Sequence, residues 1–207
     1  MEKIKKLGIL AGNRNLPFVV AEQARKAGVE HLVAVAFEGE TDPALASQVD
    51  EIVWIKVGQL SKMIHALTDR QIDRCVMAGQ VAPSNLFKVR PDLRGVMTLM
   101  RLKKRNAHTI FGAIGDELAK EGVTLISAVP WLTPVMPAEG FLAGAKPPQQ
   151  IFDDAEYGYE IAKAISKLEI GQTVVVKEGT TLAWKAGKGP MPASSAAVSF
   201  PEARAPS

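Results

Sequence analysis

Short apolar runs alternate with helical patterns through the first 130 residues of the chain. Buried parallel strands appear in a sequence as continuous runs of apolar residues that stop at glycine or polar positions. Five such runs predict strands over residues 4–11, 31–37, 50–57, 75–78 and 123–129. Apolar residues at helical spacing lie between them and predict helices over residues 16–27, 60–69 and 106–121. This alternation indicates an α/β fold, a Rossmann-like parallel sheet with flanking helices.

Prolines and glycines cluster between residues 130 and 148, a composition typical of a domain boundary. Beyond them the pattern predicts an amphipathic helix over residues 153–168 and a β-branched strand over residues 173–177. From residue 184 on, alanine, serine, proline and glycine dominate without periodicity, which predicts disorder. The predicted domains are therefore an N-terminal α/β domain (1–130), a linker (131–149), the start of a second, C-terminal catalytic-type α/β domain (150–183) and an aberrant tail (184–207).

Composition narrows the class of protein. The 207 residues are 47% hydrophobic and 23% charged, which excludes a collagen, a wholly disordered chain and a disulfide-stapled miniprotein. The single cysteine, Cys75, has no partner for an internal disulfide. No apolar run approaches the ~18 residues that span a bilayer, and the first one is too short for a signal peptide. We therefore expect a cytoplasmic, soluble protein.

The charge distribution bears on possible partners. The net charge is +3, and the sequence lacks the concentrated basic stripe that nucleic-acid binding requires, so we expect no nucleic-acid partner. The one basic cluster is RLKKR, residues 101–105. A solvated helix face explains this cluster more simply than contact with an anionic membrane or a substrate phosphate.

Three loops with glycine follow predicted strands, at the place where a parallel sheet binds its ligands. They are AGNRNLP (residues 11–17), AGQVAPSNLF (78–87) and KEGTT (177–181). Glycine allows a close approach of backbone to ligand, and a helix that follows offers free N–H groups to an anion. None of the loops matches a dinucleotide or P-loop fingerprint. Together they predict a site for an anionic ligand.

Familiar catalytic constellations are missing from the sequence. The histidines, His31, His65 and His108, are scattered, and there is no HExxH, CxxC or GxSxG motif. Asp92 and Arg94, within VRPDLRG, form either a charged loop contact or the cap of a helix that begins near residue 96. The residue types alone therefore indicate an α/β protein with anion-binding loops and do not indicate a reaction.

Four strings spread over the first 183 residues resemble the LpxI-type UDP-2,3-diacylglucosamine pyrophosphatases of lipid A biosynthesis. They are LGILAGNRNLP (7–17), AGQVAPSNLFKVRPDLRG (78–95), TIFGAIGDELAKEG (109–122) and LEIGQTVVVKEGTTLA (168–183). One departure is visible just before the predicted long helix, where many relatives have acids and this chain has Ala107 and His108.

The resemblance implies a two-domain hydrolase that holds its substrate between the domains. Water attacks the uridine-side phosphorus of UDP-2,3-diacylglucosamine and releases UMP and 2,3-diacylglucosamine 1-phosphate. A divalent metal, usually Mg²⁺, is implied, because a diphosphate transition state needs cations to spread its charge; the metal ligands are unknown. The residues that the resemblance assigns to substrate binding are Ala11, Gly12, Asn13, Gly79, Gln80, Val81, Arg94, Lys177 and Gly179.

The resemblance also implies partners and a location. The acyl chains of the substrate imply transient contact with the inner-membrane surface by a cytoplasmic, peripheral protein, and relatives imply a homodimer. Two alternatives come from other classes: a non-catalytic α/β nucleotide-binding module, and a misfolded remnant of a pseudogene.

The tail suggests a change of reading frame. Relatives continue after the KEG strand with a stretch similar to LAVEAxEGTDA, whereas this chain reads LAWKAGKGPMPAS from residue 182. Back-translation with suitable synonymous codons, read from one base earlier, yields VEGGKGTDACI and then LRGGEL. We therefore predict a frameshift close to Trp184. The family's catalytic aspartate then lies beyond the break, no catalytic residue is present, and the truncated chain is expected to be inactive.

Overall fold

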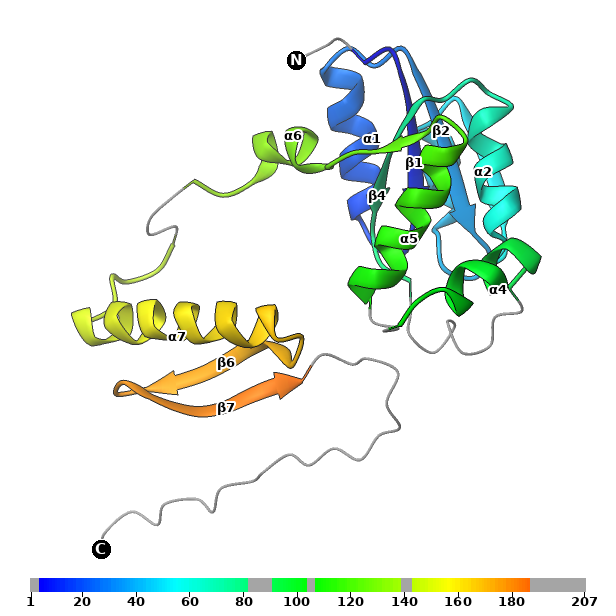
Figure 1. Ribbon diagram of the computed structural model, residues 1–207. Helices are drawn as coiled ribbons and strands as arrows, with labels where there is room; N and C mark the ends of the chain where they lie inside the picture. Colours follow the sequence, from blue (N-terminus) through cyan, green and yellow to red (C-terminus); the bar gives the residue numbers. More distant parts are fainter. Residues whose placement is uncertain (1–3, 82–90, 104–106, 139–142, 187–207) are drawn as a thin grey trace, which may run out of the picture. The chain divides into compact units, whose positions relative to one another are not determined.

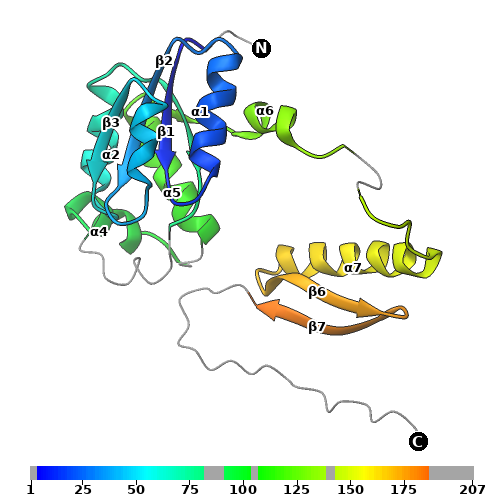
Figure 2. The same cartoon turned by 180° about the vertical axis from the view of Figure 1, so that it is seen from behind.

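The computed structural model describes residues 4–81, 91–103, 107–138 and 143–186. The chain forms two compact units, Met1–Pro137 and Ala138–Ser207. In the first, helices cover both faces of a parallel sheet; in the second, one helix lies on a two-stranded hairpin (Figures 1 and 2). The α/β fold predicted from the alternating pattern is confirmed.

The sheet of the first unit has the order β3-β2-β1-β4-β5, and every neighbouring pair is parallel. Its strands are β1 (Lys6–Ala11), β2 (His31–Phe37), β3 (Glu51–Ile55), β4 (Arg74–Ala78) and β5 (Thr124–Leu125). The chain proceeds outward from β1 to β3 and then returns across β1 to form β4. The carboxyl ends of β1 and β4 are therefore the topological switch point, where open α/β sheets bind their ligands.

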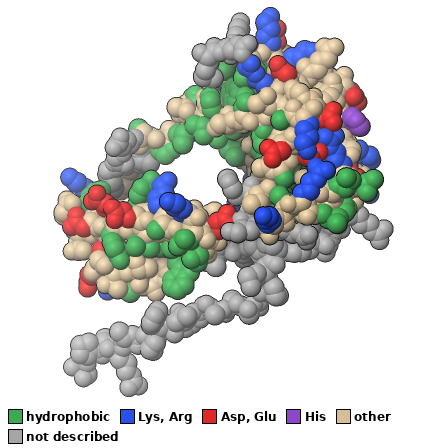
Figure 3. Space-filling model, viewed as in Figure 1, with side chains coloured by type: hydrophobic (Ala, Val, Ile, Leu, Met, Phe, Trp, Pro, Cys, Tyr) green, Lys and Arg blue, Asp and Glu red, His purple; other side chains and the backbone are tan. Residues whose placement is uncertain are grey.

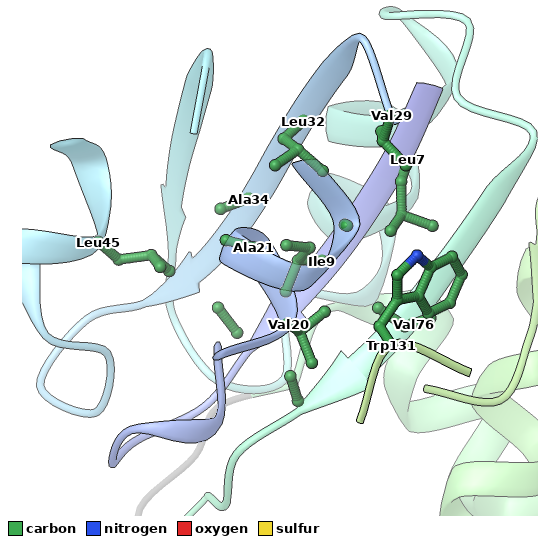
Figure 4. Close-up of a cluster of buried hydrophobic side chains, with 13 residues drawn as sticks. Leu7, Ile9, Val20, Ala21, Val29, Leu32, Ala34, Leu45, Val76 and Trp131 are labelled. Carbon is green, nitrogen blue, oxygen red and sulfur yellow. The ribbon is translucent and has the colours of Figure 1, made fainter. Parts of the chain in front are cut away.

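Successive residues of each strand point to opposite faces of this sheet, and helices cover both faces, so both sets of side chains are buried. On one face, Leu7 and Ile9 lie in a cluster with residues of α1 (Leu16–Lys26) and α6 (Val129–Leu132), as Figure 4 shows. On the other face, Leu10 and Val33 lie in a cluster with residues of α2 (Leu60–Thr68) and α5 (Ala107–Lys120). Three shorter elements complete the unit: η1 (Pro43–Ser47), α4 (Leu93–Met100) and η2 (Thr133–Val135).

The fifth strand is shorter than predicted. The sequence predicts a strand through residue 129, but β5 has only two residues and the chain enters α6 at Val129. Pro130 stands in the first turn of α6, where its missing N–H group is not needed. Trp131 follows and is only 4% exposed, in the cluster that contains Leu7 and Val76. Residues 131–137, assigned to the linker from the sequence, thus lie within the first compact unit.

The second unit consists of α7 (Gln149–Lys167), β6 (Gly171–Lys177) and β7 (Thr180–Ala186). A Cβ atom on Gly158 of α7 would lie 3.1 Å from Cγ2 of Val176, so the helix lies close against the hairpin. Strand β7 was not predicted: Trp184 pairs with Val174, so residues 184–186 are strand rather than tail. The rest of the predicted tail, 187–207, lies outside the described residues. Within the described part of this unit, no hydrophobic side chain is buried.

Candidate functional site

The loops that follow β1 and β4 contact each other at the switch point. The Gly12 N–H donates to the Ala78 carbonyl oxygen (2.8 Å), and the Asn13 N–H donates to the Gln80 carbonyl oxygen (2.7 Å). A Cβ atom on Gly12 would lie 2.6 Å from the Gln80 oxygen, and one on Gly79 would lie 2.5 Å from the Asn13 oxygen. Gly79 also has a φ of +87°, which side-chain-bearing residues rarely adopt. Glycine at these positions lets two backbones approach each other.

This packing changes the role expected of the two glycine loops. Their N–H groups were expected to face an anionic ligand, but those of Gly12 and Asn13 are bonded to protein carbonyl groups. These two N–H groups are therefore not available to a ligand. An isolated bridge pairs the half-buried Asn13 with the exposed Gln80, next to the buried Ala11 and the half-buried Val81.

The loop after β2 joins this edge and supplies residues that the sequence analysis missed. The Asn13 Nδ2 group donates to Glu40 Oε2 (2.9 Å), and the Thr41 hydroxyl donates to the Ala11 carbonyl oxygen. The same hydroxyl accepts a hydrogen bond from the Phe37 N–H (2.9 Å). No local motif marks Glu40 and Thr41, because they lie about one strand and one helix away from Asn13 in sequence and only the parallel sheet brings them to it.

Asn13 also has an unsatisfied hydrogen-bond acceptor. Its Oδ1 atom is buried and has no hydrogen-bond partner among the residues that the structure describes. A buried acceptor without a donor costs about 1–3 kcal/mol. A ligand that brings a hydrogen-bond donor to this atom would recover that free energy, so Oδ1 favours a ligand with N–H or O–H groups.

Arg14 is a second residue that the sequence analysis missed. It lies in the loop between β1 and α1, and its side chain is exposed. Its φ of +67° is in the left-handed region, which costs a non-glycine residue about 1–2 kcal/mol. In the described part of the chain its guanidinium has no hydrogen-bond or ion-pair partner. Among the described residues, no carboxylate pairs with this cation, which lies beside the switch point and close to the N-terminus of a helix, where an anion is favoured.

Arg94, in contrast, is engaged within the first unit. Its Nε donates to Glu117 Oε2 (2.7 Å) and its Nη1 to Glu121 Oε1 (2.9 Å), which joins α4 to α5. Hydrogen bonds to Glu117 and Glu121 raise the pKa of Arg94. Glu117 is only 6% exposed, and hydrogen bonds from Lys120 and Arg94 hold its pKa below the ordinary value. A phosphate would have to displace these carboxylates, so this geometry favours a structural role for Arg94.

The neighbourhood of Arg94 also resolves the alternatives for Asp92. Its Oδ1 accepts from the Gly95 N–H (2.8 Å), so Asp92 caps α4, which begins at Leu93 rather than near residue 96. Its Oδ2 accepts from the Ser61 N–H (2.7 Å) and ties the cap to α2. The basic cluster 101–105 was expected on a helix face, but α4 ends at Met100, so its described residues, 101–103, follow the helix.

The third glycine loop is a hairpin turn rather than the end of a parallel strand. Glu178 and Gly179 have φ angles of +50° and +71°, as a two-residue hairpin turn requires, and they join β6 to β7. The Gly179 N–H donates to Asp154 Oδ1 (2.7 Å), and the Glu178 N–H donates to Asp154 Oδ2 (2.9 Å). A carboxylate already occupies these donors, so the turn does not offer them to an anion. Lys177 beside it has a largely exposed side chain.

Replacing Asp154 with asparagine is expected to loosen this turn. The hydrogen bonds from Gly179 and Glu178 hold the pKa of Asp154 below its ordinary value, so their stabilisation is present above that value and is lost as pH falls through the folded pKa. Asparagine keeps one acceptor oxygen and turns an N–H group toward the other donor. We expect faster hydrogen–deuterium exchange at the Glu178 and Gly179 amides. The matched control is Asp153→Asn, whose carboxylate accepts a hydrogen bond from Gln149 (2.9 Å) and from no other described residue. Equal exchange in both variants would contradict the assignment.

Metal ligands and the cysteine thiol are the remaining reactive groups to consider in the described residues. No group of three or more His, Cys, Asp or Glu side chains is placed there to hold a metal ion. Cys75 is buried in β4, and burial raises the pKa of its thiol to about 12, so it is not a nucleophile at neutral pH. No described helix has the length and apolar character needed to cross a bilayer.

Comparison with known proteins links this chain to one family. The model of the LpxI N-terminal domain matches residues 6–134, and the model of the LpxI C-terminal domain matches residues 138–191. A relative from Caulobacter vibrioides, UDP-2,3-diacylglucosamine pyrophosphatase LpxI, is 29% identical over 189 residues. That match covers 90% of this chain and 66% of the relative, so the chain spans slightly less than two thirds of the relative's length.

Proposed function

Because the chain belongs to the LpxI family, we propose that its function is that of a hydrolase of lipid A biosynthesis. The substrate is UDP-2,3-diacylglucosamine, and the products are UMP and 2,3-diacylglucosamine 1-phosphate. The observation on which this proposal depends is that both LpxI domain models match in order along one chain. The meeting of the Gly12 and Gly79 loops at the switch point supports it, because these loops belong to the strings that resemble the family.

We propose that the side chains at the switch point contact the nucleotide part of the substrate. The Asn13 Oδ1 acceptor would receive an N–H or O–H group, and Arg14 would supply the cation that the sequence analysis sought in Arg94. Gly12 and Gly79 shape the loops, with Gln80 beside them. Lys177 and Gly179 belong to the second unit, where Lys177 remains a proposed phosphate contact and Gly179 shapes the hairpin turn.

A divalent metal remains part of the proposal as a component of the family's reaction. The residues that the structure describes do not offer a cluster of carboxylate, histidine or thiolate ligands for it. We therefore assign no step of the reaction to a metal held by these residues.

We further propose that this chain itself turns over little or no substrate. The described second unit buries only Asp154, Gly158 and Gly171, so it lacks the apolar core that would hold groups rigidly for catalysis. Positioning of reactants contributes many orders of magnitude to catalysis, and an error of about 1 Å already costs roughly a hundredfold.

Release of UMP from UDP-2,3-diacylglucosamine with Mg²⁺ tests the proposal. We expect a protein with the frame corrected at codon 184 to release UMP at least about a hundredfold faster than the 207-residue chain. UMP release by neither protein would contradict the proposed function, and equal release by both would contradict the inactivity of this chain. A base-level read of codons 182–186 tests the frameshift directly, because an unbroken, well-supported frame there would exclude it.

The alternative, a non-catalytic nucleotide-binding module, is supported by the parallel sheet of the first unit, which is compact by itself. Calorimetry with UMP, UDP-sugars and NAD separates the two proposals. Preference for acylated UDP-glucosamine supports the hydrolase, and preference for NAD contradicts it. The proposed location is cytoplasmic and peripheral to the inner membrane, and a homodimer is the proposed assembly.

A further inference from the structure

Helix α4 exposes its apolar side and buries small or polar residues. At 100° per residue, four large apolar side chains fall within one arc of about 100°, on the same side of the helix. These residues, the α4 stripe, are Leu93 (77% exposed), Val96 (38%), Met97 (48%) and Met100 (73%). The buried positions of the helix are Gly95 and Thr98. Figure 3 shows hydrophobic side chains gathered over α4.

Polar contacts hold α4 in this orientation. The Asp92 carboxylate binds the N–H groups of Gly95 and Ser61, and Arg94 binds Glu117 and Glu121 of α5. The cap and the ion pairs therefore anchor the helix, while the four residues of the α4 stripe stay exposed. Single exposed apolar residues are common on protein surfaces, but four on one arc of an eight-residue helix form a patch that fits a partner.

The charge beside the α4 stripe indicates what kind of partner it fits. Arg101 and Lys103 follow the helix and are exposed, and the sequence continues with Lys104 and Arg105. Arg101 also lies 3.6 Å from Glu117 Oε1, but 63% of its side chain stays exposed. No acidic residue occurs in the sequence between Asp92 and Asp116, and the Glu117 and Glu121 carboxylates near the helix are paired with Arg94. An apolar helix face next to a run of cations is typical of segments that lie in the interface of an anionic bilayer. A second copy of the same surface would instead bring two basic runs together.

We propose that the α4 stripe, together with Arg101 and Lys103 after it, docks on the surface of an anionic lipid bilayer. Leu93, Met97 and Met100 enter the boundary between headgroups and acyl chains, while Arg101 and Lys103 lie at the level of the lipid phosphates. The inference rests on the proposed function in one respect: a diacylated substrate resides in a bilayer, which gives the protein a reason to bind there. Binding to vesicles is measured without substrate, so its failure and the failure of hydrolysis are separate results.

Co-sedimentation of the 207-residue chain with vesicles tests this inference. We expect binding to equimolar phosphatidylcholine and phosphatidylglycerol, little binding to phosphatidylcholine alone, and weaker binding as salt increases. The double variant Met97→Gln/Met100→Gln and the double variant Arg101→Gln/Lys103→Gln should each bind at least about tenfold more weakly. The matched controls are Met136→Gln, which is 57% exposed elsewhere in the first unit, and Lys5→Gln/Lys26→Gln, at the opposite edge of the sheet.

Several outcomes would overturn the inference. Unchanged vesicle binding by both α4 variants would do so, as would a loss of binding in Trp184→Gln instead, because Trp184 is 59% exposed in the second unit. If sedimentation velocity shows that Met97→Gln/Met100→Gln abolishes self-association and leaves vesicle binding intact, a second copy covers the stripe. Circular dichroism of each variant establishes that it folds, and the four substituted side chains are all on the surface, so folding should persist.

Discussion

Alanine at Gly79 is expected to destabilise the first unit by about 2–4 kcal/mol. Two costs add: a left-handed backbone conformation at a φ of +87°, and a new Cβ atom 2.5 Å from the Asn13 carbonyl oxygen. The obstacle is the backbone of the loop after β1, which cannot rotate away as a side chain could. Gly12→Ala meets the Gln80 backbone at 2.6 Å without the positive φ, and should cost about 1–3 kcal/mol.

Two other glycines separate these contributions. Gly39 has a φ of +76° but nothing within 4 Å of its Cβ position, so Gly39→Ala should cost about 1–2 kcal/mol from conformation alone. Gly112 lies in α5 with open space around it, so Gly112→Ala should stabilise the unit by about 1 kcal/mol. Urea unfolding followed by circular dichroism measures all four. If Gly79→Ala costs no more than Gly39→Ala, the close approach of the two loops is wrong.

Removal of the Trp131 side chain is expected to cost about 3–5 kcal/mol of unfolding free energy. The indole is 4% exposed and lies beside Leu7 and Val76, from β1 and β4 (Figure 4). Alanine would leave a cavity between the sheet and α6 that the rigid strands cannot close. The same measurement, urea unfolding of the first unit, decides the result.

The chain offers the same substitution at two other tryptophans. Trp54 is 38% exposed on β3 and Trp184 is 59% exposed on β7. Trp54→Ala should cost clearly less than Trp131→Ala, and Trp184→Ala should change the unfolding of the first unit by no more than about 0.5 kcal/mol. A Trp131→Ala variant as stable as Trp54→Ala would place residue 131 outside the core and within the linker predicted from the sequence.

The candidate site shows which features the sequence predicts and which it does not. The two loops at Gly12 and Gly79 could be predicted to lie at one edge of the sheet, because parallel strands all end at the same edge. The partners of their N–H groups could not be predicted, since Ala78 and Gln80 become acceptors only when β4 pairs with β1. Arg94 was assigned to a phosphate for the same reason: its charge is visible in the sequence, but its carboxylate partners on α5 are not.

The amino-acid sequence by itself determined the alternation of buried strands and helices, and with it the parallel sheet, because local spacing of apolar residues sets which faces must leave water. Only the tertiary structure decided that residues 177–181 form an antiparallel hairpin turn, that Trp131 completes a core, and that the apolar side of α4 faces outward. Those outcomes depend on Asp154, on the space beside Leu7 and on the cap at Asp92, which are contacts between distant segments. The pattern of a single segment does not contain the identity of its neighbours.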